Sequence, residues 1–266
     1  MRANHSKTVW ISHRGYYKHC VENTLLAFDE AINAGFSMLE TDLRCTKDNH
    51  LVLCHDPDLS RLGISNKTIS DMTYDEIKKI ELRFYSKIMF FEDFSDRYAA
   101  YNWILDIKPE NGTRTIEQLV LWAHKSPTNL NTINHHCWFL FWDSKQEALF
   151  IKHFPNATIL PNQRSCWRAG LSIYFGLSFL GNIQKDKIYA LPPQFGGRYF
   201  YKKSIRDIFH KKGAKLLAYL PEKTSDIENA EKSNFDFILS NVKPIFKKRS
   251  FKNSRNYKKQ PPRRKI

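Results

Sequence analysis

Short apolar runs alternate along this chain with longer stretches in which apolar residues recur at helical spacing. The first run, Thr8–Ser12, predicts a buried strand. The stretch Thr24–Ala34 predicts a helix, with Asn23 as its N-cap and Gly35 where a helix commonly ends. A second strand is expected over Phe36–Leu43, so the chain begins with a strand–helix–strand unit.

The same alternation continues to the end of the chain. Helices are predicted at Tyr74–Leu82, Thr115–Lys125, Lys145–His153, Cys166–Leu180, Lys203–Lys212 and Ser225–Lys232, the first within an irregular insertion over Asp58–Tyr101. Eight strands are expected, at Thr8–Ser12, Phe36–Leu43, Trp103–Lys108, Cys137–Phe141, Ala157–Pro161, Lys187–Leu191, Lys215–Tyr219 and Phe235–Ser240. Eight strands alternating with helices predict a TIM (β/α)8 barrel, for which 266 residues is an ordinary length.

A β-hairpin excursion is predicted directly after the second strand. Lys47–His50 is typical of a tight turn, because Asp48 and Asn49 tolerate positive φ angles. With these two as the loop residues, Lys47 pairs with His50 and the returning strand places His55 opposite Asp42. Side chains alternate along a strand, so this register brings His55 to the face that carries Asp42.

Charge is concentrated at the C-terminus. The net charge is +15, and residues 247–266 hold ten of the 42 Lys and Arg and no acidic residue. This composition predicts a disordered basic tail after a barrel domain at 1–246. A solvated tail is our first interpretation. An anionic membrane surface is the alternative partner, and nucleic acid is not expected.

Cysteine usage bears on the compartment. The five cysteines are scattered, odd in number and without a CxxC pair, which favours a reducing environment over disulfides or a zinc site. The first 15 residues contain no apolar segment typical of a signal peptide. A cytoplasmic protein, peripheral at a membrane if the tail binds lipid, is the expectation.

Several groups capable of catalysis follow predicted strands. His13-Arg14-Gly15 ends the first strand, where arginine suits a phosphate and glycine permits a tight turn. A solvated polar loop is the alternative. His55 ends another apolar run and is a second candidate for acid–base chemistry, or else a simple polar residue at a strand end.

Two further pairs of charged residues each lie on one face of a predicted strand. Glu40 and Asp42 are costly together unless a cation neutralises them, and their oxygens suit Ca²⁺ or Mg²⁺. An exposed strand face is the alternative. Asp106 and Lys108 form either a structural ion pair or a third metal ligand with a second phosphate-binding cation.

These motifs together resemble the glycerophosphodiester phosphodiesterase family, which shares its barrel with the phosphatidylinositol-specific phospholipases C. The dense match covers 11–61, with looser matches at 105–109, 218–220 and 235–241. Its motifs are HRG at 13–15, ENT at 22–24, E-x-D and T-K-D between 40 and 48, and HD-x-x-L-x-R at 55–61.

The resemblance implies a reaction and the residues that perform it. His13 and His55 would be the general acid and base, and Arg14 and Lys108 would bind the phosphate. The reaction would be metal-dependent hydrolysis of a glycerophosphodiester to glycerol 3-phosphate and an alcohol. A lysophospholipase D-type lipid phosphodiesterase, or a catalytically silent barrel that binds ligands, is the alternative.

The resemblance also implies supporting and metal-binding residues. Glu22 would orient the site, and Asn23 would cap the helix behind it. Glu40, Asp42 and Asp106 would hold one divalent cation, Mg²⁺ or Ca²⁺.

This chain departs from the family pattern mostly on the substrate side. The family usually has Glu at the position of Asp106, Pro at Val21 and Asp at Asn241. A Ser-Phe-Asp segment is replaced by Phe-Trp-Asp at 141–143, and Trp-Thr-Val-Asn by Tyr-Leu-Pro-Glu at 219–222. The leaving alcohol is therefore the part of the reaction that these residues define least.

Overall fold

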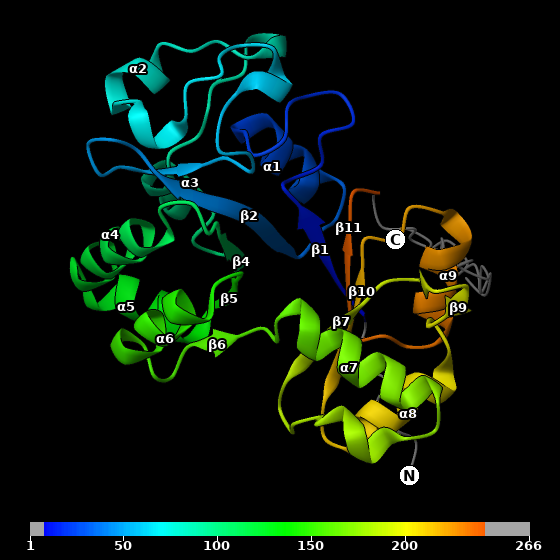
Figure 1. Cartoon of the computed structure of the whole chain (residues 1–266). Helices are drawn as coiled ribbons and strands as arrows, with labels where there is room; N and C mark the ends of the chain where they lie inside the picture. The colour runs from blue at the N-terminus through cyan, green and yellow to red at the C-terminus, as the bar shows by residue number, and fades with distance from the viewer. Residues whose placement is uncertain (1–7, 243–266) are drawn as a thin grey trace, which may run out of the picture.

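A curled sheet of parallel strands forms the centre of the protein. The computed structural model describes residues 8–242. The strands run in the order β6-β5-β4-β2-β1-β11-β10-β7, so the predicted α/β barrel architecture with eight parallel strands is confirmed (Figure 1). Their bounds are β1 Val9–His13, β2 Met38–Cys45, β4 Asn102–Ile107, β5 Cys137–Phe141, β6 Thr158–Ile159, β7 Ile188–Leu191, β10 Lys215–Tyr219 and β11 Phe237–Ser240.

The sheet does not close into a complete ring. Within residues 8–242, the end strands β6 and β7 share no backbone pairing, so the barrel is open along one edge. We call this edge the seam. Two short strands, β8 (Gln194–Phe195) and β9 (Arg198–Tyr199), form a separate antiparallel hairpin after β7.

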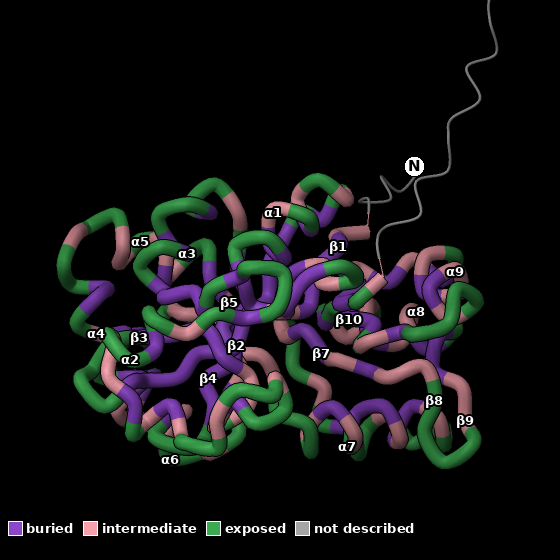
Figure 2. The backbone as a smooth tube through the Cα atoms, turned by 90° about the horizontal axis from the view of Figure 1, so that it is seen from above, coloured by how far each residue is buried: buried purple, intermediate pink, exposed green. Residues whose placement is uncertain are grey.

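Helices cover the outside of the sheet. Figure 2 shows buried strands at the centre and exposed backbone on the outer faces of the helices. All eight residues of β2 are buried, as expected for a parallel strand covered on both faces. The helices are α1 Leu25–Asn33, α2 Tyr74–Lys78, α3 Phe91–Arg97, α4 Gly112–His124, α5 Pro127–His135, α6 Ser144–His153, α7 Gln163–Tyr174, α8 Lys203–Lys211 and α9 Thr224–Lys232. Short 3-10 turns lie at Ser60–Leu62, Ile69–Asp71, Arg83–Tyr85 and Ser178–Gly181.

The hairpin after β2 exists, but its predicted register is wrong by one residue. β3 (Leu51–Leu53) pairs antiparallel with β2, and Leu43 faces Leu53. The Cys54 amide then donates to the Asp42 carbonyl at 3.2 Å, so Cys54, and not His55, lies opposite Asp42. The loop has three residues instead of two, because Asn49 alone takes a left-handed φ of 70°.

The start of α1 also differs from the prediction. Thr24 is the N-cap, and its hydroxyl accepts a hydrogen bond from the Ala27 amide. Asn23 precedes the helix with a left-handed φ of 54° and does not cap it. Gly35 lies just past the helix with a φ of 92°, as its predicted position at the helix end requires.

Two helices were absent from the prediction. α3 lies inside the segment predicted to be mostly irregular, and no side chain caps its start. α5 begins at Pro127, and the Ser126 hydroxyl accepts a hydrogen bond from the Asn129 amide. Both pack next to the first half of the sheet, beside α4 (Figure 1).

The basic tail and the proposed boundary at 246 lie outside the described residues. Within 8–242, no helix has the length and apolar character needed to cross a membrane. The five cysteines are free and buried.

Candidate active site

The turn after β1 brings the backbone of Arg14 to the neighbouring strand. The amide of Arg14, whose φ is 58°, donates to Glu40 Oε2 at 2.9 Å. Gly15 follows with a φ of 81°, and a Cβ there would lie 2.6 Å from the Ala27 carbonyl carbon of α1. Only glycine fits this approach without strain, which explains the glycine of the His-Arg-Gly sequence physically.

Three carboxylates meet at the C-terminal ends of β2 and β4. Asp42 pairs in register with Asp106 across these two strands, and Glu40 lies on the same face of β2. Oxygens of Glu40, Asp42 and Asp106 all lie within 4.8 Å of one another. Each residue is at most 5% exposed, so their mutual repulsion is little screened by water.

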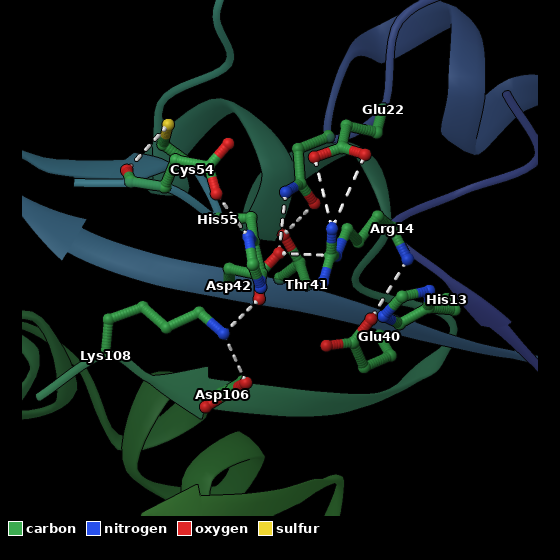
Figure 3. Close-up of polar contacts among 12 residues, drawn as sticks. His13, Arg14, Glu22, Glu40, Thr41, Asp42, Cys54, His55, Asp106 and Lys108 are labelled. Atoms are coloured by element: carbon green, nitrogen blue, oxygen red, sulfur yellow. Dashed lines mark hydrogen bonds and ion pairs between the residues drawn. The ribbon is translucent and has the colours of Figure 1, made fainter. Parts of the chain in front are cut away.

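Two cations partly neutralise this cluster. Lys108 Nζ lies 2.8 Å from Asp42 Oδ1 and 2.6 Å from Asp106 Oδ2, between the two carboxylates (Figure 3). Arg14 Nε lies 3.2 Å from Asp42 Oδ2, and its Nη1 lies 3.3 Å from Glu22 Oε1. The predicted phosphate ligands Arg14 and Lys108 therefore lie together.

The pKa values of the three carboxyl groups shift in different directions. Burial, together with the charges of Asp42 and Asp106, raises the pKa of Glu40 well above its ordinary value. Burial likewise raises the pKa of Asp106, although Lys108 opposes it. Burial also acts on Asp42, but Lys108 and Arg14 outweigh it and lower the pKa of that carboxyl.

The donor set fits a hard divalent cation. Among the described residues, the buried Asp42 Oδ1 accepts no well-directed hydrogen bond, despite the nearby Lys108 ammonium. Asp42 and its two neighbours supply oxygen atoms only, as Mg²⁺ and Ca²⁺ prefer. Burial and then repulsion by Asp42 and Asp106 raise the pKa of Glu40, and a cation here would offset both.

Asn23 has a positioning role, in place of the capping role expected for it. Its Nδ2 donates to Asp42 Oδ2 at 2.8 Å, and its Oδ1 accepts from the Thr41 hydroxyl at 2.9 Å. The three side chains are buried, so the amide holds the carboxylate in one orientation.

His13 ends β1 and is 8% exposed. Its Nδ1 lies 2.8 Å from Asn241 Oδ1, which places the proton on Nδ1 and leaves Nε2 with a lone pair. Burial, followed by the charge of Arg14, lowers the pKa of His13 to about 4. The imidazole is therefore neutral at neutral pH.

His55 reaches the site from beyond the end of β3. Its Nδ1 lies 2.7 Å from Asp56 Oδ1, and Arg61 bridges Asp56 to Glu22. Arg44 Nη2 donates to the His55 carbonyl at 2.6 Å and holds the backbone. These contacts place His55 without the predicted pairing to Asp42.

Trp142 is a site residue whose role sequence reasoning did not identify. Its Nε1 donates to Asp106 Oδ1 at 2.7 Å, and Lys108 Nζ lies 5.6 Å from the ring centroid. The sequence marked Trp142 only as part of the Phe-Trp-Asp segment at 141–143 that replaces Ser-Phe-Asp. The signal available was its place after β5, whose Leu140 is in register with Asp106.

These groups line one end of a cavity of about 440 Å³. His13, Arg14, Glu40, His55, Asp106 and Lys108 all line it, so both histidines and the two cations face the same space as the acidic cluster. The rest of the wall is mostly apolar, formed by Ile104, Leu140, Phe141, Trp142, Leu160, Pro161, Cys166, Trp167, Ile188, Ala190, Pro192, Phe195, Leu217 and Leu239, with Gln163, Gln194 and Tyr219.

Solved structures share this architecture. The glycerophosphoryl diester phosphodiesterase domain of Rv2277c from Mycobacterium tuberculosis superposes with a TM-score of 0.71 at 13% identity, covering 89% of this chain and 96% of that one. A glycerophosphodiester phosphodiesterase from Thermotoga maritima gives 0.63 at 21% identity, covering 89% and 95%. At these identities the likeness establishes the fold alone, an α/β barrel.

Sequence comparison then identifies the family. The model of the glycerophosphoryl diester phosphodiesterase family matches residues 13–154, and the chain belongs to that family. A glycerophosphodiester phosphodiesterase of Caldanaerobacter subterraneus is 41% identical over 75 residues, 28% of this chain and 31% of that protein. Human lysophospholipase D GDPD1 is 45% identical over 67 residues, 25% and 21% respectively. These two matches span less than a third of either relative.

Proposed function

We propose that this protein hydrolyses glycerophosphodiesters to glycerol 3-phosphate and an alcohol. One observation supports this most: two histidines, two cations and three carboxylates line or adjoin a single cavity. Phosphodiester hydrolysis needs an acid, a base and positive charge at the phosphate, and the described residues supply all three.

The two histidines divide the proton transfers. Neutral His13 presents Nε2 as a base, because its Nδ1 proton is engaged by Asn241. It takes a proton from the nucleophile, which is water or the adjacent glycerol hydroxyl. The Asp56 carboxylate holds His55 through its Nδ1, and His55 donates a proton to the departing alcohol.

Arg14 and Lys108 bind the phosphoryl oxygens. Both already contact carboxylates, so they are held in place before substrate arrives. Glu40, Asp42 and Asp106 would hold the divalent cation, Mg²⁺ or Ca²⁺, which would supply Lewis-acid polarisation of a phosphate oxygen.

A panel of glycerophosphodiesters, scored for glycerol 3-phosphate release with Ca²⁺, Mg²⁺ and Mn²⁺, tests the proposal. We expect turnover that EDTA abolishes and that falls by at least about 100-fold in His13→Ala and in His55→Ala. His153→Ala, at an exposed position of α6, is the matched control and should retain activity. Full activity in either site variant would refute the assignment, and substrate binding without turnover would indicate a silent barrel.

A further inference from the structure

His55 is the more exposed of the two histidines in the site. Its side chain is 34% exposed, whereas His13 is 8% exposed. A second cavity, of about 20 Å³, borders His55, Asp56 and Arg61. Packing therefore leaves the His55 ring room to turn, and polar contacts must set its direction.

Different residues hold the backbone of His55 and its ring. Arg44, which is buried, donates two hydrogen bonds to the His55 carbonyl, from Nε at 3.2 Å and from Nη2 at 2.6 Å. The ring depends on Asp56, whose Oδ1 lies 2.7 Å from Nδ1. Nε2 is then the nitrogen left for proton transfer, and Asp56 decides where it points.

Asp56 needs an anchor of its own. Its side chain is 25% exposed and lies on the loop after β3. Among residues 8–242, Arg61 is the one side chain that is hydrogen-bonded to Asp56 Oδ2, through its Nε. A carboxylate held at one oxygen alone would turn with the imidazole, so Arg61 fixes the direction in which His55 is held.

The same guanidinium reaches the phosphate side of the site. Its Nη2 pairs with Glu22 Oε1, the oxygen that also lies 3.3 Å from Arg14 Nη1 (Figure 3). Because a guanidinium is planar and rigid, its Nε and Nη2 keep the two bound carboxylates at a fixed spacing. Arg61 therefore connects the partner of the proposed acid with the partner of a proposed phosphate ligand.

Packing holds the segments that carry these groups. Val21, Cys54 and Leu59, each within two positions of Glu22, His55 or Arg61, belong to one buried apolar cluster. Arg61 lies on the 3-10 turn that follows, and its side chain is 49% exposed. Its replacement removes charge contacts and little buried surface, so the fold should stay intact.

We propose that Arg61 is a positioning residue for the proton donor His55. Its guanidinium anchors Asp56 to Glu22, and His55 Nε2 thereby points at the leaving oxygen of a bound diester. The inference rests on the proposed function, in which His55 is the acid. In that reaction the nucleophile bonds to phosphorus and gives its proton to His13. The bond from phosphorus to the alcohol oxygen breaks, and this oxygen takes the Nε2 proton of His55.

Two diesters of glycerol 3-phosphate separate proton donation from phosphate binding. Choline leaves glycerophosphocholine as an alkoxide that needs a proton, whereas 4-nitrophenolate leaves the 4-nitrophenyl ester without one. Arg61→Lys keeps the charge but cannot hold both carboxylates with one rigid group. We expect it to lower kcat for glycerophosphocholine by about tenfold or more. The kcat for the aryl ester and the KM for both should change by less than about twofold.

Arg97→Lys is the matched control. The Arg97 side chain is 51% exposed, and its Nε and Nη2 both contact Asp29, so the substitution removes a similar pairing away from the cavity. It should leave both kcat values unchanged. Circular dichroism verifies that each variant is folded.

A double variant tests whether Arg61 acts through His55. His55→Ala should reproduce the selective loss more strongly than Arg61→Lys. Adding Arg61→Lys to it should cause no further loss, because both residues serve the same proton transfer. A further loss in the double variant would overturn the proposal.

The remaining outcomes separate this inference from the proposed function. Equal losses with the two diesters, or an unchanged kcat for glycerophosphocholine, would overturn the positioning role. If the wild type hydrolyses neither diester, the proposed function fails, and nitrogen NMR decides on Arg61. A shift of the His55 ring nitrogens in Arg61→Lys, absent in Arg97→Lys, would then support the positioning role, and unshifted nitrogens would overturn it.

Discussion

Asn241 Oδ1 lies 2.8 Å from His13 Nδ1 and sets the tautomer of that imidazole. His13 ends β1 and Asn241 follows the adjacent strand β11, and the two strands pair in parallel register up to Ser12 and Ser240. An amide at this position orients the ring without adding charge. A carboxylate, which the family pattern has here, would orient it and also stabilise its protonated form.

Asn241→Asp should raise the pKa of His13 from about 4. Because the base must be neutral, activity is lost as pH falls through this pKa. The acid limb of the kcat/KM profile should therefore move to higher pH, by about one unit. Asn131→Asp, exposed on α5, makes the same charge change elsewhere and should leave the limb in place.

His13 also makes stability depend on pH. Its pKa is about 4 in the folded protein against an ordinary value of 6.5, so the unfolded chain binds more protons between these values. Its contribution to the free energy of unfolding is present above pH 6.5 and is lost as pH falls toward 4. In His13→Gln, the free energy of unfolding measured by urea denaturation should change less with pH between 4 and 6.5. The same pH dependence in the variant and the wild type would contradict the lowered pKa of His13.

Metal binding should stabilise the wild type and release a proton. Burial and neighbouring carboxylates raise the pKa of Glu40, so a cation displaces its proton and binds more tightly as pH rises. At 100 times its Kd the cation should add about 2.7 kcal/mol, a rise in Tm of about 5–10 °C. Glu40→Gln should lose most of this rise, while Glu117→Gln on α4 should retain it.

Trp142→Phe should weaken metal binding. The variant keeps an aromatic ring but removes the indole N–H that Asp106 Oδ1 accepts. Loss of a partner to a metal ligand costs about 10–100-fold in affinity, measurable by calorimetry. Trp167→Phe is the matched control, because Trp167 lines the same cavity and packs against Phe195. Equal affinities in the two variants would remove Trp142 from the site.

Gly15→Ala should destabilise the protein more than Gly63→Ala does. Both glycines have left-handed φ angles, of 81° and 74°, and strain of this kind costs about 1–3 kcal/mol. A Cβ at Gly15 would also collide with Ala27, whereas one at Gly63 meets nothing within 4 Å. Urea denaturation measures the free energy of unfolding of both variants. The difference between the two losses gives the cost of the close contact with Ala27.

The order of strands and helices was predictable because each barrel strand is a short apolar run followed by a polar, cappable stretch. Parallel strands buried on both faces give this signal directly. The acidic cluster was predictable for a similar reason, since alternation places Glu40 and Asp42 on one face and β4 lies next to β2.

Local geometry that depends on one backbone angle was not predictable. Two positive φ angles were assigned to the hairpin loop, whereas Asn49 alone adopts one, and the register moved by one residue. Thr24 and Asn23 both suit an N-cap, and only the contact of Asn23 with Asp42 decides between them. The failure of β6 to pair with β7 is a long-range property that strand patterns do not encode.

The open seam has a consequence for how such a protein diversifies. The charged groups and both histidines of the site precede Phe154, where the family match ends, whereas the neutral amide of Asn241 contacts His13 from beyond it. The apolar wall comes mostly from residues after 154, where the fold is shared with distant structures at low identity. The groups that would transfer protons and bind phosphate therefore come from residues before 154, and most of the apolar wall comes from residues after it. Mutations after residue 154 can change the shape of the apolar wall while the histidines and charged groups of the site stay in place.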